Sequence, residues 1–265
     1  MNARVVGLVK AEEGRSPAFK RVLNLERYLD LLDRTEYRRV ETAADEEAIY
    51  KLRYRSYLRS HLVEENDEQM IYDEYEDLPN SYRYAVLVDG ELAATLRFHH
   101  VCAATPWSPA MTSFKSLLGP RVANGESFID ASRFAVSPEW TGSNSPMPAI
   151  TIRLSFMACE HFKTPYAINM VRSDHAIYYR RMFGFRQIGQ PYQYTSTLKS
   201  GGKVVSEVLL YEGDLRTERS RIYTNFPFYV STARERSLLF DRPAAGQDAP
   251  LSVAPTARVA LNSAA

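Results

Sequence analysis

Cysteine is scarce in this chain of 265 residues, which contains only Cys102 and Cys159. Two thiols cannot form a disulfide framework or a four-ligand metal site, so we expect a reducing compartment and no metal centre. No apolar run approaches the length of a membrane span, and the N-terminus lacks the apolar core of a secretory signal. The sequence therefore predicts a cytoplasmic globular protein with no transmembrane segment.

An excess of charge is also missing, because 33 basic and 32 acidic residues give a formal net charge of +1. Without a basic excess, we do not expect binding to nucleic acid. Hydrophobic residues make up 45% and charged residues 25% of the chain, which is the usual mixture for a folded globular protein. Only seven of the 33 basic residues are Lys, which leaves 26 Arg. Arg presents a planar group that suits carboxylate or phosphate.

The order of the predicted elements indicates an α/β fold in which helices cover one mixed sheet. Thr42-Ala43-Ala44-Asp45 is a helix start of the capping-box type, and its helix should reach about Leu62. Residues 63–80 are acidic and have no period, so we expect an extended loop. Asp89-Gly90 between two apolar runs predicts a hairpin over 84–98. Further strands are predicted at 37–40, 128–136, 166–171, 185–193 and 203–211, further helices from about 150 to 161 and from 173 or 174 to Gly184, and an inserted loop at 103–125.

Four segments can be distinguished along the chain. Residues 1–35 form a weakly patterned N-terminal lead, and residues 36–212 form the folded domain. Residues 213–240 are an Arg-rich C-terminal extension. Residues 241–265 are rich in Pro and Ala and have no period, so we expect a disordered tail there.

Two arginines occupy predicted elements where a charge needs either water or a partner. Arg53 lies one helical turn before Tyr57, so the two share a helix face, which is also typical of a solvated surface. Arg97 interrupts an apolar strand, and a buried arginine at that place requires a counter-charge. The acidic run Asp73-Glu74-Tyr75-Glu76-Asp77 can pair with either arginine or form a solvated surface.

A third candidate is Asp130-Ala131-Ser132-Arg133, in the strand at 128–136. Strict alternation sends Asp130 and Arg133 to opposite faces, unless a bulge between them restores a common side. The two residues then form either an edge-strand ion pair or a carboxylate and a guanidinium that share a cleft. In a cleft, the carboxylate takes a proton and the guanidinium orients a substrate carboxylate.

Two later segments carry weaker patterns. Gly142-Ser143-Asn144-Ser145 precedes a predicted helix, where successive amides bind a phosphate or form an ordinary turn. The segment Asp174–Phe185 contains His175 and two tyrosines, which are more often structural than functional in such a place.

Taken together, these motifs resemble the GNAT acyltransferase superfamily and, within it, the N-acyl amino acid synthase branch (N-acyltyrosine synthase-like), a relative of acyl-homoserine-lactone synthases. The resemblance covers about residues 36–195. It implies a mixed sheet that splays open at the strand 128–136, a bulge in that strand, and a thioester donor in the splay. It rests on Leu52-Arg53 with Tyr57, the acidic loop, Thr95-Leu96-Arg97, Asp130-x-Ser132-Arg133-Phe134-x-Val136 and Tyr178-Tyr179-Arg180-Arg181-Met182-Phe183-Gly184-Phe185.

The resemblance also implies roles for individual residues. Asp130 and Arg133 match the catalytic positions, and Asp130 is the candidate general base for the amine. Strand amides near Phe134–Val136 would stabilise the oxyanion. Substrate-binding roles fall on Arg53, Tyr57, Glu74, Asp77, Arg97, Ser132, His175 and Tyr179, and acyl-donor or oxyanion roles on Phe134, Val136, Gly142, Ser143 and Asn144.

One feature of the sequence fits the family pattern in two ways, and another departs from it. The acidic pair three residues apart fits Glu74 and Asp77, although Asp73 and Glu76 fit almost as well. The diphosphate loop of the family reads Arg-Gly-x-Gly or similar, whereas residues 141–146 here read Thr-Gly-Ser-Asn-Ser-Pro. An acyl carrier protein, which presents only phosphopantetheine, suits this loop better than CoA.

The implied reaction moves a fatty acyl group from a thioester to the α-amine of an amino acid. No cofactor is expected to be bound permanently, and the co-substrate is an acyl-phosphopantetheine thioester on an acyl carrier protein or on CoA. The expected partners are therefore the carrier protein and the amino acid. Two alternatives are a signal synthase of the acyl-homoserine-lactone type that uses S-adenosylmethionine, and a non-catalytic GNAT-like module that binds acyl carrier protein.

Overall fold

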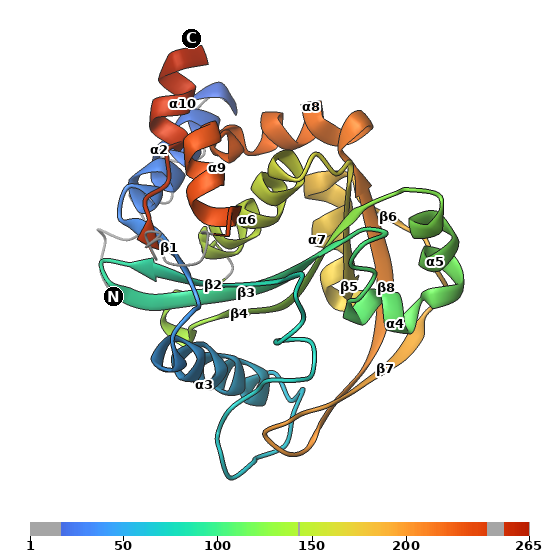
Figure 1. Cartoon of the computed structure of the whole chain (residues 1–265). Coiled ribbons are helices and arrows are strands. Elements are labelled where there is room, and N and C mark those ends of the chain that lie inside the picture. The colour runs from blue at the N-terminus through green and yellow to red at the C-terminus, as the bar shows by residue number, and fades with distance from the viewer. Residues whose placement is uncertain (1–16, 143, 243–251, 265) are drawn as a thin grey trace.

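Nine strands form one mixed sheet in the described part of the chain, residues 17–142, 144–242 and 252–264 of a computed structural model (Figure 1). The order across the sheet is β6-β8-β5-β4-β3-β2-β1-β9, and β7 pairs with β8 off this path. β4 and β5 run parallel, while the other pairs are antiparallel. The strands are β1 Thr35–Arg39, β2 Ser81–Val88, β3 Glu91–Val101, β4 Phe128–Val136, β5 Tyr166–Val171, β6 Arg186–Gln187, β7 Tyr192–Thr197, β8 Lys203–Asp214 and β9 Ser252–Val253.

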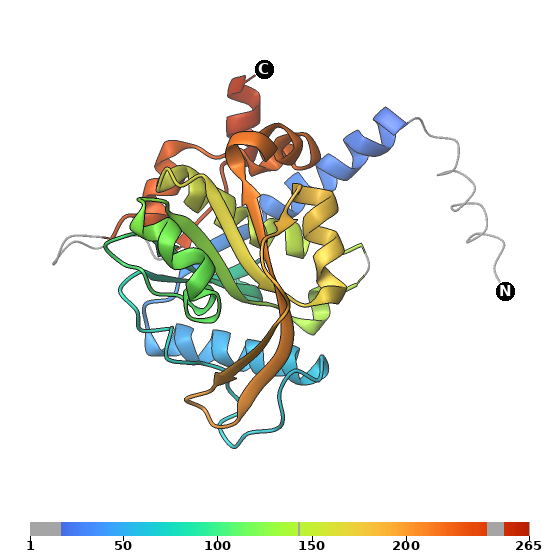
Figure 2. The ribbon, with the colours of Figure 1, turned by 90° about the vertical axis from the view of Figure 1, so that its right-hand side faces the viewer.

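Helices cover both faces of this sheet, which confirms the predicted fold class. In Figure 1, α3 lies below the sheet and α6 above it. Figure 2 shows the long β7–β8 hairpin running down past the sheet to the level of α3. The helices are α2 Pro17–Leu32, α3 Ala43–Arg59, α4 Pro109–Ser113, α5 Lys115–Ala123, α6 Met147–His161, α7 Ser173–Phe183, α8 Leu215–Asn225, α9 Ala233–Phe240 and α10 Ala257–Ala264, with 3-10 turns η1 Pro138–Trp140 and η2 Pro227–Tyr229.

The main core lies between the sheet and α6. Every residue of α6 from Met147 to Cys159 is buried except Pro148, so this helix is covered on all sides. A helix that is apolar around most of its surface needs such a cover. The segment from η2 to α9 provides part of it through Phe228 and Phe240, so the Arg-rich extension contributes to the same core as the sheet.

Several predicted elements are confirmed at or near their expected bounds. α3 begins after Thr42, whose hydroxyl accepts a hydrogen bond from the Asp45 amide at 3.1 Å. The hairpin turns at Asp89-Gly90, and both residues have the positive φ that such a turn requires. Strands 128–136 and 166–171 match β4 and β5 residue for residue.

Other predictions of local structure are wrong. The expected loop at 103–125 contains α4 and α5, because Ser108 caps α4 and its early proline is tolerated in the first helical turn. Neither Ser173 nor Asp174 caps α7, since Arg172 occupies the N-cap position and makes no side-chain cap bond. The expected strand 185–193 is interrupted, since β6 covers only Arg186–Gln187 and the last two residues of the range already belong to β7.

The prediction of a disordered tail at 241–265 is wrong for its described residues. Val253 of β9 pairs with Tyr37 of β1 at the edge of the sheet. α10 follows, with Ala257 buried in the main core. Thr256 accounts for the placement of this segment, because its amide and hydroxyl both donate to the buried Glu235 carboxylate. The burial of Ala257 and the Thr256–Glu235 hydrogen bonds each involve only one or two residues of this segment. They therefore leave no periodic hydrophobic pattern in the sequence.

β4 contains the predicted bulge. From Thr95 to Arg97, β3 advances by two residues, whereas its partner β4 advances by three, from Ser132 to Ala135. Arg133 lies in this irregular stretch, and its backbone is left-handed with φ of +50°. A bulge lets neighbouring side chains share one face. Ser132 and Asp130 point to the face of Arg97, which donates to Ser132 Oγ at 3.1 Å, and Arg133 joins them there. Asp130 and Arg133 therefore lie on the same side of the sheet.

Candidate active site

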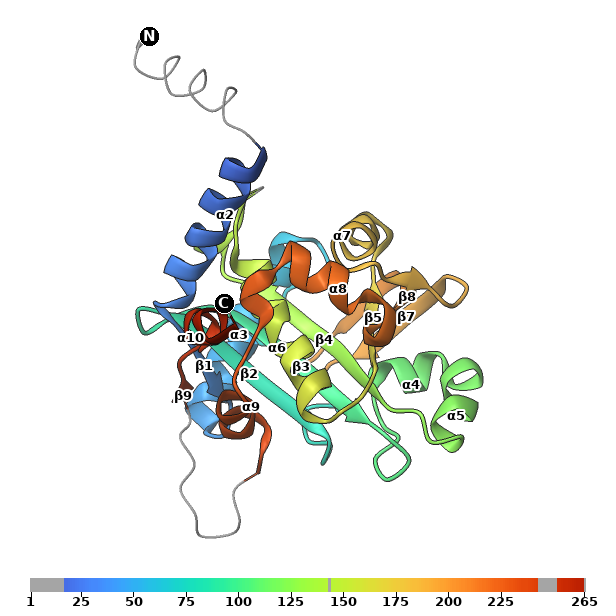
Figure 3. The same ribbon diagram turned by 90° about the horizontal axis from the view of Figure 1, so that it is seen from above.

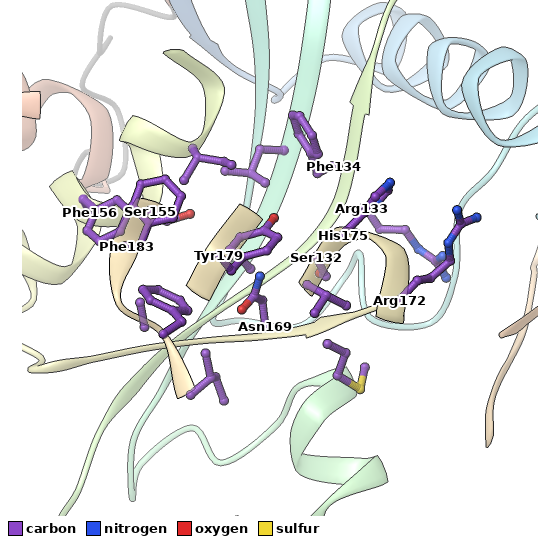
Figure 4. Close-up of a pocket in the computed structure, with 18 of the residues that line it drawn as sticks. Ser132, Arg133, Phe134, Ser155, Phe156, Asn169, Arg172, His175, Tyr179 and Phe183 are labelled. Carbon is purple, nitrogen blue, oxygen red and sulfur yellow. The ribbon is translucent and has the colours of Figure 1, made fainter. Parts of the chain in front are cut away.

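β4 and β5 separate in the middle of the sheet. Their parallel pairing runs from Phe128 and Tyr166 to Ala131 and Asn169 and stops there, although both strands continue. A cavity of about 180 Å³ occupies the opening, bounded by these strands together with α6 and α7 (Figure 4). The backbone of β4 beyond Ala131 has no strand partner on this side, so its polar groups are available to a ligand.

Three polar side chains project into this largely apolar cavity from different elements: Ser155 of α6, Asn169 of β5 and Tyr179 of α7 (Figure 4). Ser155 Oγ and Asn169 Oδ1 are buried and make no hydrogen bond within the described residues. Burial raises the pKa of Tyr179 to about 12, and the neighbouring Asn169 opposes the shift. Tyr179 is therefore a neutral donor at physiological pH, and the other two can bind a polar ligand group.

Two further cavities adjoin the first one. On the α3 side, a cavity of about 130 Å³ shares Tyr57, Ser132 and Arg133 with it and is also lined by Arg97. On the opposite side, a cavity of about 600 Å³ shares Phe134, Ile152, His175 and Tyr179 with it. The opening between β4 and β5 is thus accessible from both faces of the sheet.

A buried ionic cluster lies against the α3-side cavity. Arg97 Nη1 donates to Asp73 Oδ1 at 2.5 Å and to Glu76 Oε1 at 2.6 Å. Arg133 Nε donates to Asp73 Oδ2 at 2.9 Å, and Arg53 Nη1 to Glu76 Oε1 at 2.7 Å. Arg53 and Arg97 are fully buried. The acidic loop is therefore fixed to α3, β3 and β4 by charge-assisted hydrogen bonds.

Positive charge exceeds negative charge in this cluster. Burial would raise the pKa of the Asp73 carboxyl, but the charges of Arg133 and Arg97 outweigh it and hold that pKa well below its usual value. Three guanidinium groups face two carboxylates, which leaves one positive charge in excess. Arg53 Nε and Nη2 also find no hydrogen-bond partner within the described residues. The cluster thus favours a further anion nearby.

The assignment of Glu74 and Asp77 to substrate binding is not supported by their positions. Both are exposed, and Asp77 pairs with Lys199 at 2.6 Å at the tip of the β7–β8 hairpin. Asp73 and Glu76, which the spacing fits almost as well, are the buried pair instead. Asp73 accepts from the Tyr75 amide, and this local turn directs it inward.

Asp130 is buried but does not line any of the three cavities. Its Oδ2 accepts a hydrogen bond from the Ala110 amide at 3.0 Å, at the start of α4, while Oδ1 has no partner. Burial raises its pKa to about 6, against the opposing effects of Ser108 and Ala110. The group is therefore poised to exchange a proton near neutral pH, although its bonded oxygen is directed to α4.

The remaining predicted residues differ in how they lie relative to the cavities. Tyr57, Ser132, Phe134, His175 and Tyr179 line the first cavity, with His175 largely exposed at its rim. Gly142 and Asn144 line the 600 Å³ cavity. Val136 packs in the core opposite Ala94 and lines none of the three, and Arg53 acts on the site only through Glu76. Ser143 lies outside the described residues.

Some residues of the site were missed in the sequence. Asn169 interrupts the apolar run of β5 and Ser155 that of α6, so a polar residue inside each apolar element was the available signal. Arg172 lines the two smaller cavities and carries no comparable signal. Within the described residues, no group of His, Cys, Asp and Glu could hold a metal ion. None of the described helices combines the length and apolarity needed to cross a membrane.

Comparisons with known proteins agree with this architecture. A solved structure of the N-acyl amino acid synthase FeeM from uncultured soil microbes superposes with a TM-score of 0.56 at 14% identity, covering 72% of this chain and 97% of that chain. The CoA-dependent acyl-homoserine lactone synthase MesI and the synthase LasI each give a TM-score of 0.47 at 18% identity, covering 71% and 72% of this chain and 89% and 94% of theirs. Comparison with curated proteins gives no match.

At such low identity, the structural likeness shows only that the fold is shared. The sequence itself matches the model of the family described as N-acyl amino acid synthase FeeM over residues 48–201, which is more than half of its length. The chain is therefore an acyltransferase that belongs to the FeeM N-acyl amino acid synthase family.

Proposed function

We propose that this acyltransferase moves a fatty acyl group from the phosphopantetheine thioester of an acyl carrier protein, or of CoA, to the α-amine of an amino acid. The observation that carries the proposal is the separation of β4 from β5 after Ala131 and Asn169. It opens a cavity that adjoins an uncharged loop on one face and a cluster of arginines on the other. The uncharged acyl-pantetheine part of the donor arm and a carboxylate-bearing acceptor suit these two sides.

In this proposal the donor arm enters through the 600 Å³ cavity, past Gly142 and Asn144. The thioester carbonyl lies against β4 near Phe134, where backbone amides without a strand partner can donate to the oxyanion. The thiolate that leaves needs a proton. Tyr179 is neutral at physiological pH and lines both cavities, so it is our candidate donor of that proton.

The acceptor amino acid approaches from the α3 side, where Arg97 and Arg133 line the second cavity. The excess positive charge of the ionic cluster favours the substrate carboxylate at this end. The amine must lose a proton to attack. Asp130 has a pKa of about 6 and one free carboxylate oxygen, so we keep it as the candidate base, acting through water because it does not line the cavity.

Product analysis tests the proposal. The purified chain is incubated with long-chain acyl carrier protein and a pool of amino acids, and N-acyl amino acids are sought by mass spectrometry. Release of methylthioadenosine from S-adenosylmethionine in a parallel reaction would indicate a signal synthase instead. Absence of N-acyl amino acids with both carrier-protein and CoA donors would exclude the proposed reaction.

The role of Asp130 is tested separately. Asp130→Asn should lower kcat by about 100-fold or more, because general-base catalysis typically contributes that much. For the unmodified enzyme, kcat/KM should rise with pH through about 6, as the carboxyl loses its proton. Asp77→Asn is the matched control and should keep full turnover, because Asp77 is exposed and lines none of the three cavities. Full turnover of Asp130→Asn would remove this residue as the base.

A further inference from the structure

The helix α2 contributes to the donor side of the cavity system. Arg27 and Tyr28 line the 600 Å³ cavity together with Gly142 and Asn144. Figure 3 shows α2 running beside the chain that leads into α6. Arg27 also lines a neighbouring cavity of about 800 Å³ on the other side of the same loop. α2 lies outside residues 48–201, so the family match does not assign it a role.

α2 is firmly positioned by contacts from the C-terminal part of the chain. The ring of Tyr28 stacks on Phe228 with centroids 4.6 Å apart. Leu29 and Leu32 are buried in the main core. On the outer side, Arg258 of α10 pairs with three carboxylates of the helix and its end: Glu26 at 3.2 Å, Asp30 at 3.1 Å and Asp33 at 2.9 Å.

These contacts leave the charge of Arg27 available. Its two acidic neighbours along the helix, Glu26 and Asp30, are both paired with Arg258. Arg27 is exposed and has no ion-pair partner within the described residues. Of the other acidic groups around the two cavities, Asp174 is paired with Arg172 and Glu139 bonds to Ser137. The loop at 141–145 carries no charged side chain.

We infer that α2 supplies the phosphate-binding group of the donor site. Arg27 binds the phosphate of the phosphopantetheine arm across the cavity from Gly142 and Asn144, and the Tyr28 ring packs along the arm as it enters. A guanidinium suits this role because it donates two parallel hydrogen bonds to phosphate. The inference rests on the proposed function, since it assumes that the cavity takes a phosphopantetheine donor.

Calorimetric binding of two probes to the full chain tests this inference without turnover. 4′-Phosphopantetheine should bind at least tenfold more tightly than pantetheine, which lacks the phosphate. Arg27→Ala should abolish that difference and leave pantetheine binding unchanged, while Arg27→Lys should retain part of it. Arg34→Ala is the matched control, because Arg34 lines the neighbouring cavity but is paired with Asp89, and it should behave as the parent chain.

Kinetics provides the second readout. Arg27→Ala should raise KM for an acyl carrier protein donor about tenfold, with kcat within twofold, and should leave KM for acyl-pantetheine unchanged. Equal binding of the two probes by the parent chain, or equal losses in Arg27→Ala and Arg34→Ala, would overturn the inference. Product formation that is insensitive to Arg27 would remove the inference and keep the proposed function. Arg27-dependent phosphate binding without N-acyl products would keep the inference and remove the proposed function.

Discussion

Asp73 pairs with two buried arginines, so neutralising its carboxylate removes a counter-charge from both of them. Removing one partner of a buried ion pair commonly costs about 3 to 5 kcal/mol, because a charge is left buried without compensation. We therefore expect Asp73→Asn to lower the free energy of unfolding by about that amount in urea titrations. The matched variant Asp77→Asn, in an exposed pair, should change it by about 1 kcal/mol or less.

Two buried titratable groups on β3 and β4 act on stability in opposite directions. Burial and, to a smaller extent, the charge of Arg97 lower the pKa of His99 to about 3. At pH values between about 3 and 6.5, His99 is therefore protonated in the unfolded chain and neutral in the folded chain. Stability from His99 is present above about pH 6.5 and is lost as the pH falls towards 3. Asp130 has a raised pKa of about 6, so its contribution is present below about pH 3.8 and is lost as the pH rises through 6.

Substitutions should separate these two effects. Between about pH 6 and pH 4 each group contributes a slope of up to about 1.4 kcal/mol per pH unit, and the two slopes oppose one another. His99→Gln should flatten the loss of stability on acidification, whereas Asp130→Asn should steepen it. Urea unfolding at a series of pH values measures both. Parallel pH profiles for the two variants would contradict the assignment.

At the residue scale, the sequence identified the three arginines of the ionic cluster but left open which acids of the loop pair with them. Arg97 was recognisable because a charge in an apolar strand needs compensation. The loop at 63–80 has no period, and nothing in it tells which of its acids face inward. The choice of Asp73 and Glu76 over their neighbours depends on a turn at Tyr75 and on contacts from three other elements.

At the scale of elements, Gly213 marks a close approach between β8 and the aromatic wall of the cavity. A Cβ at this position would lie 2.0 Å from the Phe185 ring, which is itself buried and lines the first cavity. Gly213→Ala should therefore cost about 1 to 3 kcal/mol of stability by overpacking and should also lower activity. Gly119→Ala, in α5 with only an ordinary contact at 3.9 Å, should be neutral or stabilising by up to about 1 kcal/mol.

Elements with a strong period were predictable, and short elements were not. β4, β5 and α3 follow from alternation or from capping residues. α4 and α5 were hidden because their Pro and Gly residues also occur in loops, and tertiary contacts of Leu118 and Val122 decide the outcome. The alternation of the strand does not reveal the bulge at Arg133, which was expected only from the family resemblance and from the assumption that Asp130 and Arg133 share a side.

At the scale of the whole molecule, the segment 252–264 links the two ends of the described chain. A chain that stops at Arg242 would lose the buried Val253 and Ala257, the Thr256–Glu235 bonds and the Arg258 pairs. We expect its free energy of unfolding to fall by about 2 to 4 kcal/mol and its melting temperature by several degrees. Thermal circular dichroism measures this, and an unchanged melting temperature would contradict it.

The sequence does not show that the segments before and after residues 36–212 pack into the same core as the predicted domain. The apolar residues of 17–32 and 213–240 are spread among many charges, so their burial is not evident from their pattern. In the folded protein, Leu29 and Phe226 belong to the same cluster as Phe156 of α6. The cover of one very apolar helix thus comes from distant segments, which only the completed fold brings together.

The pairing of β9 with β1 also determines when the sheet can be completed during synthesis. β1 is among the first elements of the described chain to be made and β9 is among the last. Until β9 emerges from the ribosome, β1 remains an open edge that another nascent chain could extend. During that time, the charged side chains of Glu36, Arg38 and Arg39 disfavour pairing of this edge with another chain. Closure of this edge is therefore a late event, and the β1 amides that face β9, unlike those that face β2, should become protected from hydrogen exchange only after β9 has been synthesised.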